Sequence, residues 1–284
     1  MGQDGNTVDG SMLMGIKQKV SRALKAREIH VEMVDRCMGR RLEGHTALVT
    51  GGGSGIGLAI AERFYAEGAA VIVVGRDKQK LKAASEGKRD DHFSYCVCDM
   101  ANINQIETTF RKVIDDYKVD ILVNNAGAYV ALPFLEINEF EWSRILDTNL
   151  TGSFFAMQAF CRARMEMQST GRVVNICSNT GILGATSCYS ASKWGLVGLT
   201  RGLGKEMARY GIAINGIAPG MVASPINGID PAGDLESRHS DDGRIAVPDE
   251  IAEIALFLAS DASAHIVGQV IVCDGGESLT CTYC

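Results

Sequence analysis

The sequence predicts an α/β protein built on a doubly wound parallel sheet, and three observations carry that prediction. From Thr46 onward, short β-rich runs alternate with helical patterns, which is typical of right-handed βαβ units. Several of these runs are continuously apolar, as expected for strands that helices cover on both faces. A glycine-rich segment follows the first run directly and leads into a helical pattern. The predicted strands are Ala47–Val49, Val71–Val74, Tyr95–Cys98, Ile121–Val123, Arg172–Ile176, Ala213–Ile217 and Val270–Cys273.

Two regions of the chain differ in character. Residues 43–284 contain no break rich in proline or serine, so we expect one domain there. Residues 1–42 form a separate extension. Its first part, residues 1–11, is polar and glycine-rich and predicts disorder, whereas apolar residues from Leu13 to Arg41 fall near helical spacing. We expect this basic amphipathic helix to pack on its own protein or on a neighbouring subunit of a homotetramer. A helix on a membrane surface is the disfavoured alternative, because acidic residues interrupt the basic face.

Composition and charge exclude several classes of protein. The 284 residues carry a net charge of −6, without the basic footprint of nucleic-acid-binding proteins. No run of about eighteen apolar residues predicts a membrane span, and we recognise no secretory leader. The nine cysteines are therefore expected to be reduced thiols of a cytoplasmic protein. Cys281 and Cys284 lack a second pair of ligands, and a zinc site normally needs four, so no metal is expected.

The glycine-rich segment has the features of a phosphate-binding turn. It reads Thr50-Gly51-Gly52-Gly53-Ser54-Gly55-Ile56-Gly57 and lies between a predicted strand and a predicted helix. Glycines allow the backbone to turn tightly and to approach a phosphate closely. The helix N-terminus then offers unpaired N–H groups and the positive end of its dipole to a pyrophosphate. The order T-G-x-x-x-G-x-G resembles that of the short-chain dehydrogenase/reductase family, and this resemblance implies a Rossmann-type fold.

Further motifs of the same family follow in the same order over nearly all of the chain after residue 43. They are Asp99 after the third predicted strand, Asn124-Asn125-Ala126-Gly127 after the fourth, Asn149 in Asp147-Thr148-Asn149-Leu150, Ser178 after the fifth, Tyr189-Ser190-Ala191-Ser192-Lys193, Pro219-Gly220 after the sixth, and Asp274-Gly275-Gly276. Each motif is weak or moderate by itself, and their common order carries the resemblance.

Tyr189 and Lys193 can act together in acid–base catalysis. They are four residues apart, so on a helix they share one face about one turn apart. A phenol is a poor base at neutral pH, and a nearby lysine cation stabilises its phenolate form. The resemblance implies that Tyr189 donates a proton to a ketone while a reduced nicotinamide delivers hydride to its carbon. It further implies that Ser178 hydrogen-bonds the substrate oxygen, that Lys193 holds the nicotinamide ribose, and that Asn149 kinks its helix and holds a water that passes protons towards Lys193.

The resemblance also implies a nicotinamide cofactor. Gly75 stands where relatives that use NAD place an acidic residue, and the arginine that follows suits the phosphate of NADP. Ser54 weakens this argument, because many NADP enzymes have a basic residue there, and Asp77 is near enough to compete. NADP(H) is therefore favoured over NAD(H). The predicted cofactor-binding residues are Gly51, Gly53, Ser54, Gly55, Ile56, Gly57, Arg76, Asp99, Met100, Asn125, Ala126, Gly127, Tyr189, Lys193, Pro219, Gly220, Val222 and Ser224.

The expected substrate is a neutral, hydrophobic ketone or secondary alcohol. The stretch from Met221 to Ile245 resembles the family's mobile substrate lid and has more acidic than basic residues, which disfavours an anion. The predicted pocket neighbours are apolar or neutral, namely Tyr129, Leu183, Met221, Val222 and Ile226. The N-terminal extension and this neutral pocket resemble hydroxysteroid dehydrogenases of gut bacteria, including the 20β type, which would favour NADH and a steroid substrate.

Two other functions stay open. Reductases of 3-oxoacyl groups on acyl carrier protein have basic docking residues where this chain has Ser169 and Tyr210, although Arg209 is adjacent. A non-catalytic cofactor-binding sensor or scaffold would be favoured by a broken Ser–Tyr–Lys set, and here the set is intact.

One departure from the family is Cys177, where serine is frequent, and we expect it to be a packed side chain rather than a reactive thiol.

Overall fold

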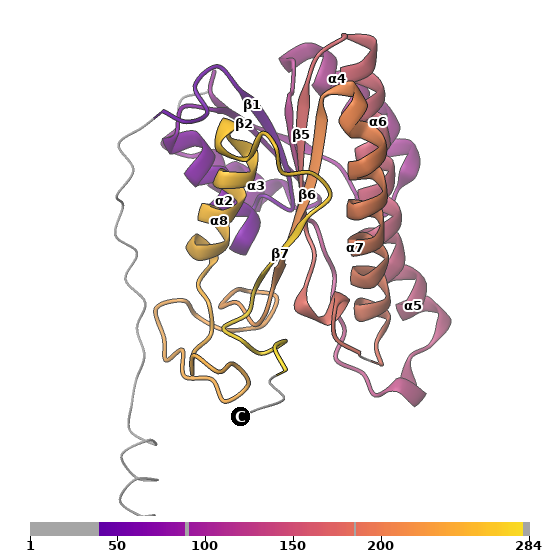
Figure 1. Cartoon of the computed structure of the whole chain (residues 1–284), viewed down its shortest axis with the longest axis vertical. Helices are drawn as coiled ribbons and strands as arrows, with labels where there is room; N and C mark the ends of the chain where they lie inside the picture. Colours follow the sequence, from indigo (N-terminus) through magenta and orange to yellow (C-terminus); the bar gives the residue numbers. More distant parts are fainter. Residues whose placement is uncertain (1–39, 89–90, 185, 281–284) are drawn as a thin grey trace, which may run out of the picture.

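A parallel sheet forms the centre of the computed structural model, which describes residues 40–88, 91–184 and 186–280. Its seven strands lie in the order β3-β2-β1-β4-β5-β6-β7, and every neighbouring pair is parallel (Figure 1). The chain winds outward from β1 to β3 on one side and from β4 to β7 on the other, which confirms the predicted doubly wound sheet. The strands are β1 Thr46–Thr50, β2 Ala70–Gly75, β3 Phe93–Val97, β4 Ile121–Asn124, β5 Gly171–Ile176, β6 Ile212–Pro219 and β7 Val270–Cys273.

The predicted strands lie within the observed ones except at β3. This strand begins two residues earlier than the predicted Tyr95–Cys98 and ends one residue earlier. Pairing with β2 sets these bounds, since Val71 lies opposite Phe93 and Gly75 lies opposite Val97. The apolar pattern of one strand does not reveal where that strand begins and ends, because pairing with the neighbouring strand determines these bounds.

Helices cover both faces of the sheet, with α2, α3 and α8 on one face and α4, α6 and α7 on the other (Figure 1). A π-helical turn, η2, joins α5 to α6. The helices are α2 Gly55–Ala66, α3 Lys78–Ser85, α4 Ile103–Tyr117, α5 Glu139–Leu146, η2 Asp147–Thr151, α6 Gly152–Glu166, α7 Cys188–Met207 and α8 Pro248–Ala259. Short 3-10 turns are η1 Phe134–Glu136, η3 Asn179–Gly181, η4 Ala208–Tyr210 and η5 Asp261–Ser263.

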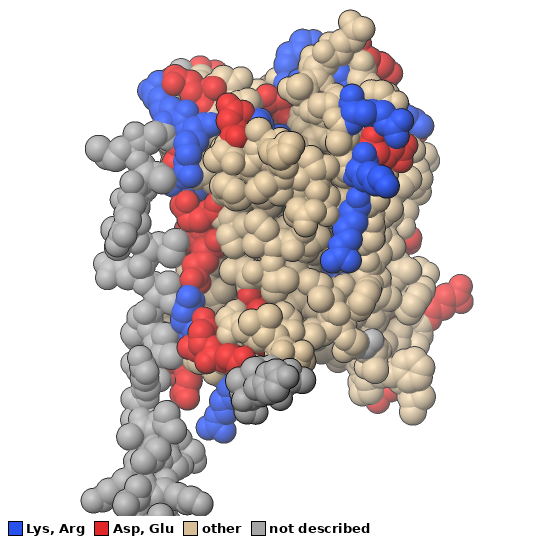
Figure 2. Space-filling model, viewed as in Figure 1, with Lys and Arg blue, Asp and Glu red and all other residues tan. Residues whose placement is uncertain are grey.

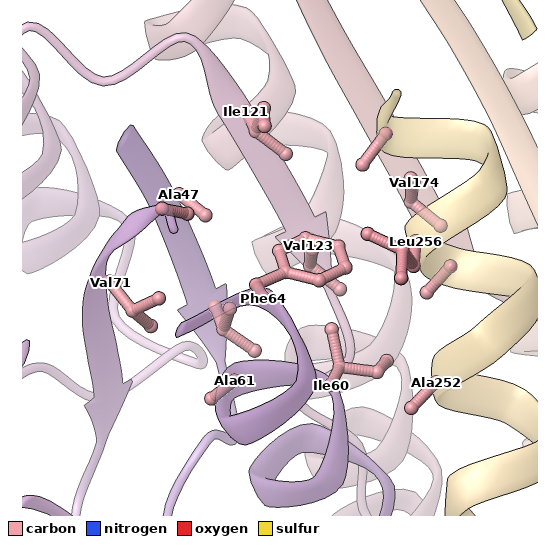
Figure 3. Packing of buried hydrophobic residues seen from close by; sticks show 14 of the residues in the cluster. Ala47, Ile60, Ala61, Phe64, Val71, Ile121, Val123, Val174, Ala252 and Leu256 are labelled. Carbon is pink, nitrogen blue, oxygen red and sulfur yellow. The ribbon is translucent and has the colours of Figure 1, made fainter. Parts of the chain in front are cut away.

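Two hydrophobic layers, one on each face of the sheet, make up the core. Because successive side chains of a strand point to opposite faces, Val49 of β1 packs in the layer of α2 and α8, and Leu48 packs in the layer of α4, α6 and α7. Figure 3 shows the first layer, in which the fully buried Phe64 of α2 lies with Val123 of β4 and Leu256 of α8. The sheet is thereby fixed between its helices, and the carboxyl ends of its strands lie at one edge, where ligands bind in folds of this kind.

Residues 1–39 of the N-terminal extension lie outside the described residues, as do Cys281 and Cys284. The helix expected from Leu13 to Arg41 does not include its last two residues, since Arg40 is irregular and Arg41 begins a turn, and the rest of it stays a prediction. Over the ranges that the structure does describe, no helix has both the length and the apolar character needed to cross a membrane.

Candidate active site

The glycine-rich turn connects the end of β1 to the start of α2. Gly51 and Gly55 have φ angles of 65° and 54°, in the left-handed region that glycine adopts without strain. A β-carbon at Gly57 would collide with the carbonyl oxygen of Gly51 and the side-chain nitrogen of Asn125. Ser54 precedes α2, and its side chain makes no capping hydrogen bond within the described chain. The first N–H groups of α2 are therefore available to an anion, and the turn fits the pyrophosphate of a dinucleotide.

Thr50 ties this turn to the end of β4. Its buried hydroxyl donates to the carbonyl oxygen of Val123 at 3.2 Å and accepts from the N–H groups of Asn125 and Ala126 at 2.9 and 3.0 Å. The Asn125 side-chain amide returns a hydrogen bond to the Thr50 carbonyl oxygen at 2.9 Å. The sequence motifs predicted Asn125 and Ala126 as cofactor-binding residues but did not single out Thr50. The available signal was its place at the head of the glycine motif.

The end of β2 lies beside the same turn and carries the residues that bear on cofactor choice. Arg76 is exposed directly after Gly75. Asp77 caps α3, because its Oδ1 accepts hydrogen bonds from the backbone N–H groups two and three residues further along the chain, at 2.9 and 3.2 Å. A β-carbon on Gly53 would come within 3.3 Å of Lys80 Cβ, so this second basic residue also borders the turn. Sequence reasoning missed Lys80, since the contact depends on how α3 packs.

Asp99 and Met100 occupy the loop after β3, which is the neighbour of β2. Asp99 Oδ1 accepts from the N–H of Ala101 at 3.0 Å, and the Asp99 N–H donates to Gln105 Oε1 at 3.0 Å. Met100 is buried, and its carbonyl oxygen lies against Gly152, where a β-carbon would collide with it. These contacts fix the loop at the edge of the nucleotide end of the site.

Tyr189 and Lys193 lie on one face of α7, as their spacing predicts. Lys193 is only 4% exposed, and its Nζ donates to the carbonyl oxygen of Ile176, the last residue of β5, at 2.7 Å. The same nitrogen lies 5.5 Å from the centroid of the Tyr189 ring. The ring of Tyr129 meets the Tyr189 ring edge to face, with 5.3 Å between centroids. A buried lysine is thus fixed beside a partly exposed tyrosine ring.

Asn149 lies in the π-helical turn η2, at the position where the sequence predicts a kink. Its Nδ2 donates to the Ala128 carbonyl oxygen at 3.0 Å and to Ser192 Oγ at 3.1 Å, and its Oδ1 accepts from the Ala128 N–H at 2.7 Å. A β-carbon on Gly127 would lie 3.7 Å from Asn149 Oδ1 and 4.0 Å from Lys193 Nζ. Such π-helical turns are frequent at functional sites, and this one places Asn149 near Gly127, to which Lys193 Nζ is also close.

Ser178 begins the short turn η3 after β5. Its Oγ accepts from the Thr180 N–H at 3.3 Å and from the Thr180 hydroxyl at 3.0 Å, and it lies 3.5 Å from Asn179 Oδ1. The turn packs closely on α7, since a β-carbon at Gly181 would come within 2.8 Å of the Lys193 carbonyl oxygen. Ser178 and Lys193 are therefore held by neighbouring elements of one rigid edge.

Cys177 precedes this serine and is buried. Burial raises the pKa of its thiol to about 11, well above the ordinary value, despite the nearby Lys193. Because the thiolate is the reactive form, the expectation that Cys177 packs as a small side chain agrees with the structure.

The beginning of the lid closes the site from the side of β6. Pro219 ends β6, and the N–H of Gly220 donates to the carbonyl oxygen of the last residue of β7 at 2.9 Å. Val222 is buried, and its carbonyl oxygen accepts from Ser224 Oγ at 3.2 Å. A β-carbon on Gly55 would lie 3.4 Å from Ser224 Cβ, so the lid reaches the glycine-rich turn.

The predicted residues thus gather in two groups at the carboxyl edge of the sheet. Most of the predicted nucleotide-binding residues surround β1 to β4 and the start of the lid, and the predicted catalytic residues surround β5, η2 and α7. Ile56 belongs to the first group through its backbone, because its side chain packs against the core. Among residues 40–88, 91–184 and 186–280, no group of His, Cys, Asp and Glu side chains could hold a metal ion.

Comparisons with known proteins agree with this geometry. A family model described as short chain dehydrogenase matches residues 45–232. The (2S)-((R)-hydroxy(phenyl)methyl)succinyl-CoA dehydrogenase subunit BbsD of Thauera aromatica is 37% identical over 245 residues, 84% of this chain and 98% of that protein. The 3-oxoacyl-(acyl-carrier-protein) reductase FabG of Thermotoga maritima is 36% identical over 247 residues, 83% of this chain and 98% of that protein.

A solved structure gives the same result in three dimensions. A variant of actinorhodin polyketide ketoreductase with NADPH superposes with a TM-score of 0.76 at 33% identity, over 86% of this chain and all of that one. The chain therefore belongs to the short-chain dehydrogenase/reductase family, and it is a nicotinamide-dependent oxidoreductase of alcohol and ketone groups.

Proposed function

We propose that this enzyme reduces a neutral, hydrophobic ketone with NADPH, or oxidises the corresponding secondary alcohol. The observation that carries the proposal is the buried Lys193 cation, fixed on the Ile176 carbonyl oxygen and 5.5 Å from the ring of Tyr189. The partly exposed Tyr189 ring is open to a substrate, while its partner cation is shielded from water. This combination places a phenol that a ketone oxygen can reach next to a buried lysine, as proton transfer to that oxygen requires.

The roles of the side chains follow from their contacts. A bound nicotinamide supplies the hydride that adds to the carbonyl carbon. Tyr189 gives its phenolic proton to the ketone oxygen, and the Lys193 cation stabilises the phenolate that remains. Ser178 donates a hydrogen bond to the same oxygen and holds the carbonyl in place. Asn149 holds the backbone of Ala128 beside Lys193 through both ends of its amide. The same residues, acting in reverse, take the proton from an alcohol.

Four features near the nucleotide end support NADP(H) as the cofactor. No carboxylate stands at Gly75, and the Asp77 carboxylate is engaged in capping α3 rather than free to turn towards a ribose. Arg76 is exposed, and Lys80 borders the glycine-rich turn. Two cations without a competing carboxylate suit the adenosine phosphate of NADP.

The surroundings of Tyr189 support a neutral, apolar substrate. Tyr129, Met221 and Ile226 are 47%, 46% and 50% exposed, so apolar surface remains available at the mouth of the site. The lid adds acidic side chains, which would repel an anion. A steroid is one substrate of this class, and small apolar ketones are another.

One observation favours a second candidate, the reduction of 3-oxoacyl groups on acyl carrier protein. Arg201, Lys205 and Arg209 follow one another at intervals of four residues on the exposed face of α7 and η4. Figure 2 shows basic side chains in a column on this side of the molecule. A carrier protein is acidic, so this column offers a docking surface even though Ser169 and Tyr210 are uncharged.

A substrate panel separates these candidates. The full-length enzyme is assayed by nicotinamide absorbance with a keto steroid, small apolar ketones, and a 3-oxoacyl group on acyl carrier protein or on a short thiol, each with NADPH and NADH. We expect turnover of the free apolar ketones with NADPH. A large preference for the carrier-bound substrate over the same acyl group on the short thiol would support the second candidate instead. No turnover of any compound would overturn both and revive the non-catalytic sensor.

The oligomeric state of the enzyme is also a proposal. We propose a homotetramer that residues 1–40 stabilise, because exposed apolar side chains, among them Phe140, Trp142 and Trp194, lie on α5 and α7. Light scattering of the full chain and of a chain lacking residues 1–40 tests this. An unchanged particle mass and melting temperature after the deletion would show that the extension has no part in assembly.

A further inference from the structure

The Asp274-Gly275-Gly276 motif builds a tight turn directly after β7. Asp274 accepts hydrogen bonds from the N–H groups of Gly276 and Ser278 at 3.1 and 2.9 Å. Gly275 and Gly276 have φ angles of 63° and 94°, which side chains other than that of glycine rarely adopt. The turn therefore has one shape, and that shape sets the place of the next side chain, Glu277.

Glu277 reaches from this turn to the loop of the catalytic serine. Its Oε2 accepts from the Asn179 side-chain amide at 2.8 Å, a contact between residues 98 apart in the sequence. Asn179 is only 4% exposed, whereas Glu277 lies at the surface, so the hydrogen bond joins a buried amide to a carboxylate that water also reaches. The same oxygen would lie 3.3 Å from a β-carbon on Gly220, which places the carboxylate between the serine loop and the end of β6.

A carboxylate fixes which end of an amide faces it. Ionised Glu277 can only accept, so the NH2 group of Asn179 must face Glu277 and the carbonyl oxygen must face the other way. That oxygen, Oδ1, lies 3.5 Å from Ser178 Oγ, at the outer limit of a hydrogen bond. Without Glu277, the amide could turn over and present its NH2 group to the serine.

The orientation matters because of the other partners of Ser178. Its Oγ already accepts from the Thr180 N–H and the Thr180 hydroxyl. A hydroxyl oxygen that accepts two hydrogen bonds has its own proton left to donate. Asn179 Oδ1 is near enough to direct that proton but too far to hold it strongly, so the proton can pass to a ketone oxygen. An inverted amide would offer a third donor to Ser178 and no acceptor for its proton.

We propose that Glu277 is a positioning residue for Ser178, which it orients as a hydrogen-bond donor by fixing the amide of Asn179. This inference rests on the proposed ketone reduction, in which Ser178 donates to the substrate oxygen. It assigns a role to the Asp-Gly-Gly turn at the end of β7, since the turn presents Glu277 to the active site. Glu277 acts through Asn179 rather than by contact with substrate.

A double-mutant cycle on the full-length enzyme tests the proposal. Glu277→Ala should lower kcat for ketone reduction about tenfold, the effect of losing a hydrogen bond to a charged group, and leave the NADPH dissociation constant within about threefold. Glu277→Gln keeps an acceptor without fixing the amide so strictly, and should recover part of the loss. Asn179→Ala should lower kcat by itself, and adding Glu277→Ala should then lower it no further. Glu107→Ala, at an exposed position of α4, is the control for removal of a surface carboxylate.

Two results would overturn the inference. One is a kcat for Glu277→Ala equal to that of the wild type, and the other is the same loss whether or not Asn179 is present. If the wild-type enzyme reduces none of the ketones, the proposed function fails separately. The stabilities of the same single and double variants are then measured by thermal unfolding. Losses of stability that are smaller together than their sum support the contact between Glu277 and Asn179, and additive losses contradict it.

Discussion

The glycine-rich turn and the lid border the same site, but different interactions hold them. In the turn, backbone groups bond to Thr50 and Asn125, and glycines allow contacts that a β-carbon would block. The lid has two isolated backbone bridges and a small apolar cluster of its own, formed around Ala223, Leu235 and Val247. Its far end is attached to α8 by the ion pair of Arg244 with Glu250.

This difference suits the roles that we propose for the two regions, with the cofactor at the turn and the substrate at the lid. A dinucleotide presents the same phosphates in every enzyme of this kind, so a rigid cradle of backbone groups suits it. Substrates differ, and a segment held by few side-chain contacts can open and close around them. We therefore expect substitutions in the turn to affect cofactor binding strongly, and substitutions in the lid to have smaller effects.

The largest effect on kcat should come from a substitution of Tyr189, because the glycine-rich turn and the lid both border the site that contains it. Tyr189→Phe removes one oxygen and should leave the fold, the ring contact with Tyr129 and NADPH binding unchanged. We expect kcat to fall at least about a hundredfold, because a general acid is lost. Steady-state kinetics and a fluorescence titration with NADPH measure the two quantities. A variant that keeps more than about a tenth of the wild-type kcat would show that the proton comes from another group.

A pair of glycine substitutions tests the rigidity of the turn. Gly57→Ala places a β-carbon against the Gly51 carbonyl oxygen and Asn125, so the turn must shift. We expect NADPH binding to weaken at least about tenfold and the free energy of unfolding to fall by about 1–3 kcal/mol, as for other overpacked sites. Gly198→Ala on α7 meets open space and should instead raise that free energy by about 0.5–1 kcal/mol. Equal NADPH binding by both variants would refute the rigid cradle.

The same contrast explains what could be predicted from the sequence. The places of Gly51 and Gly57 follow from backbone geometry that only glycine allows, and Tyr189 and Lys193 share a helix face at a fixed spacing. These features are local, so the sequence pattern reveals them. The parallel sheet follows in the same way from the alternation of strands and helices, whereas the order of its strands comes from the structure.

The missed features depend on contacts between distant segments. Thr50 bonds to residues about 75 positions away, and Glu277 bonds to Asn179 across 98 positions. Lys80 borders Gly53 only because α3 packs beside the turn. No local pattern distinguishes such residues from their neighbours. The substrate stays a proposal for the same reason, since side chains from several loops form its pocket.

Cofactor preference should change more moderately than catalysis. Arg76→Ala should lower kcat/KM with NADPH about tenfold, the effect of a lost charge-assisted hydrogen bond, and leave kcat/KM with NADH nearly unchanged. Lys80→Ala should act in the same direction but less, since a lysine binds phosphate as a flexible point charge. Lys82→Ala, on another face of α3, is the matched control. A wild-type enzyme that strongly prefers NADH would refute this assignment of Arg76 and Lys80.

The smallest effect should come from the ion pair at the end of the lid. Arg244 donates to both carboxylate oxygens of Glu250, at 2.8 and 2.6 Å, and the Val247 N–H donates to one of them at 2.9 Å. Burial opposes ionisation of Glu250, but these hydrogen bonds outweigh it, and the pKa of the carboxyl is lowered. Because the folded-state pKa lies below the unfolded value of about 4.3, the pair stabilises the fold above that pH. This contribution is lost as the pH falls through the folded-state pKa.

Glu250→Gln should therefore lower the free energy of unfolding by about 1 kcal/mol at neutral pH, or the melting temperature by about 2 °C. The difference from the wild type should shrink as the pH falls below about 4, where the wild-type carboxyl also loses its charge. Asp249→Asn removes the neighbouring exposed carboxylate of the same helical turn, and so controls for the helix dipole. Thermal unfolding over a series of pH values measures all three proteins. A loss of stability above about 3 kcal/mol, the upper end expected for Gly57→Ala, or a loss that does not depend on pH, would show that the lid is held as rigidly as the glycine-rich turn.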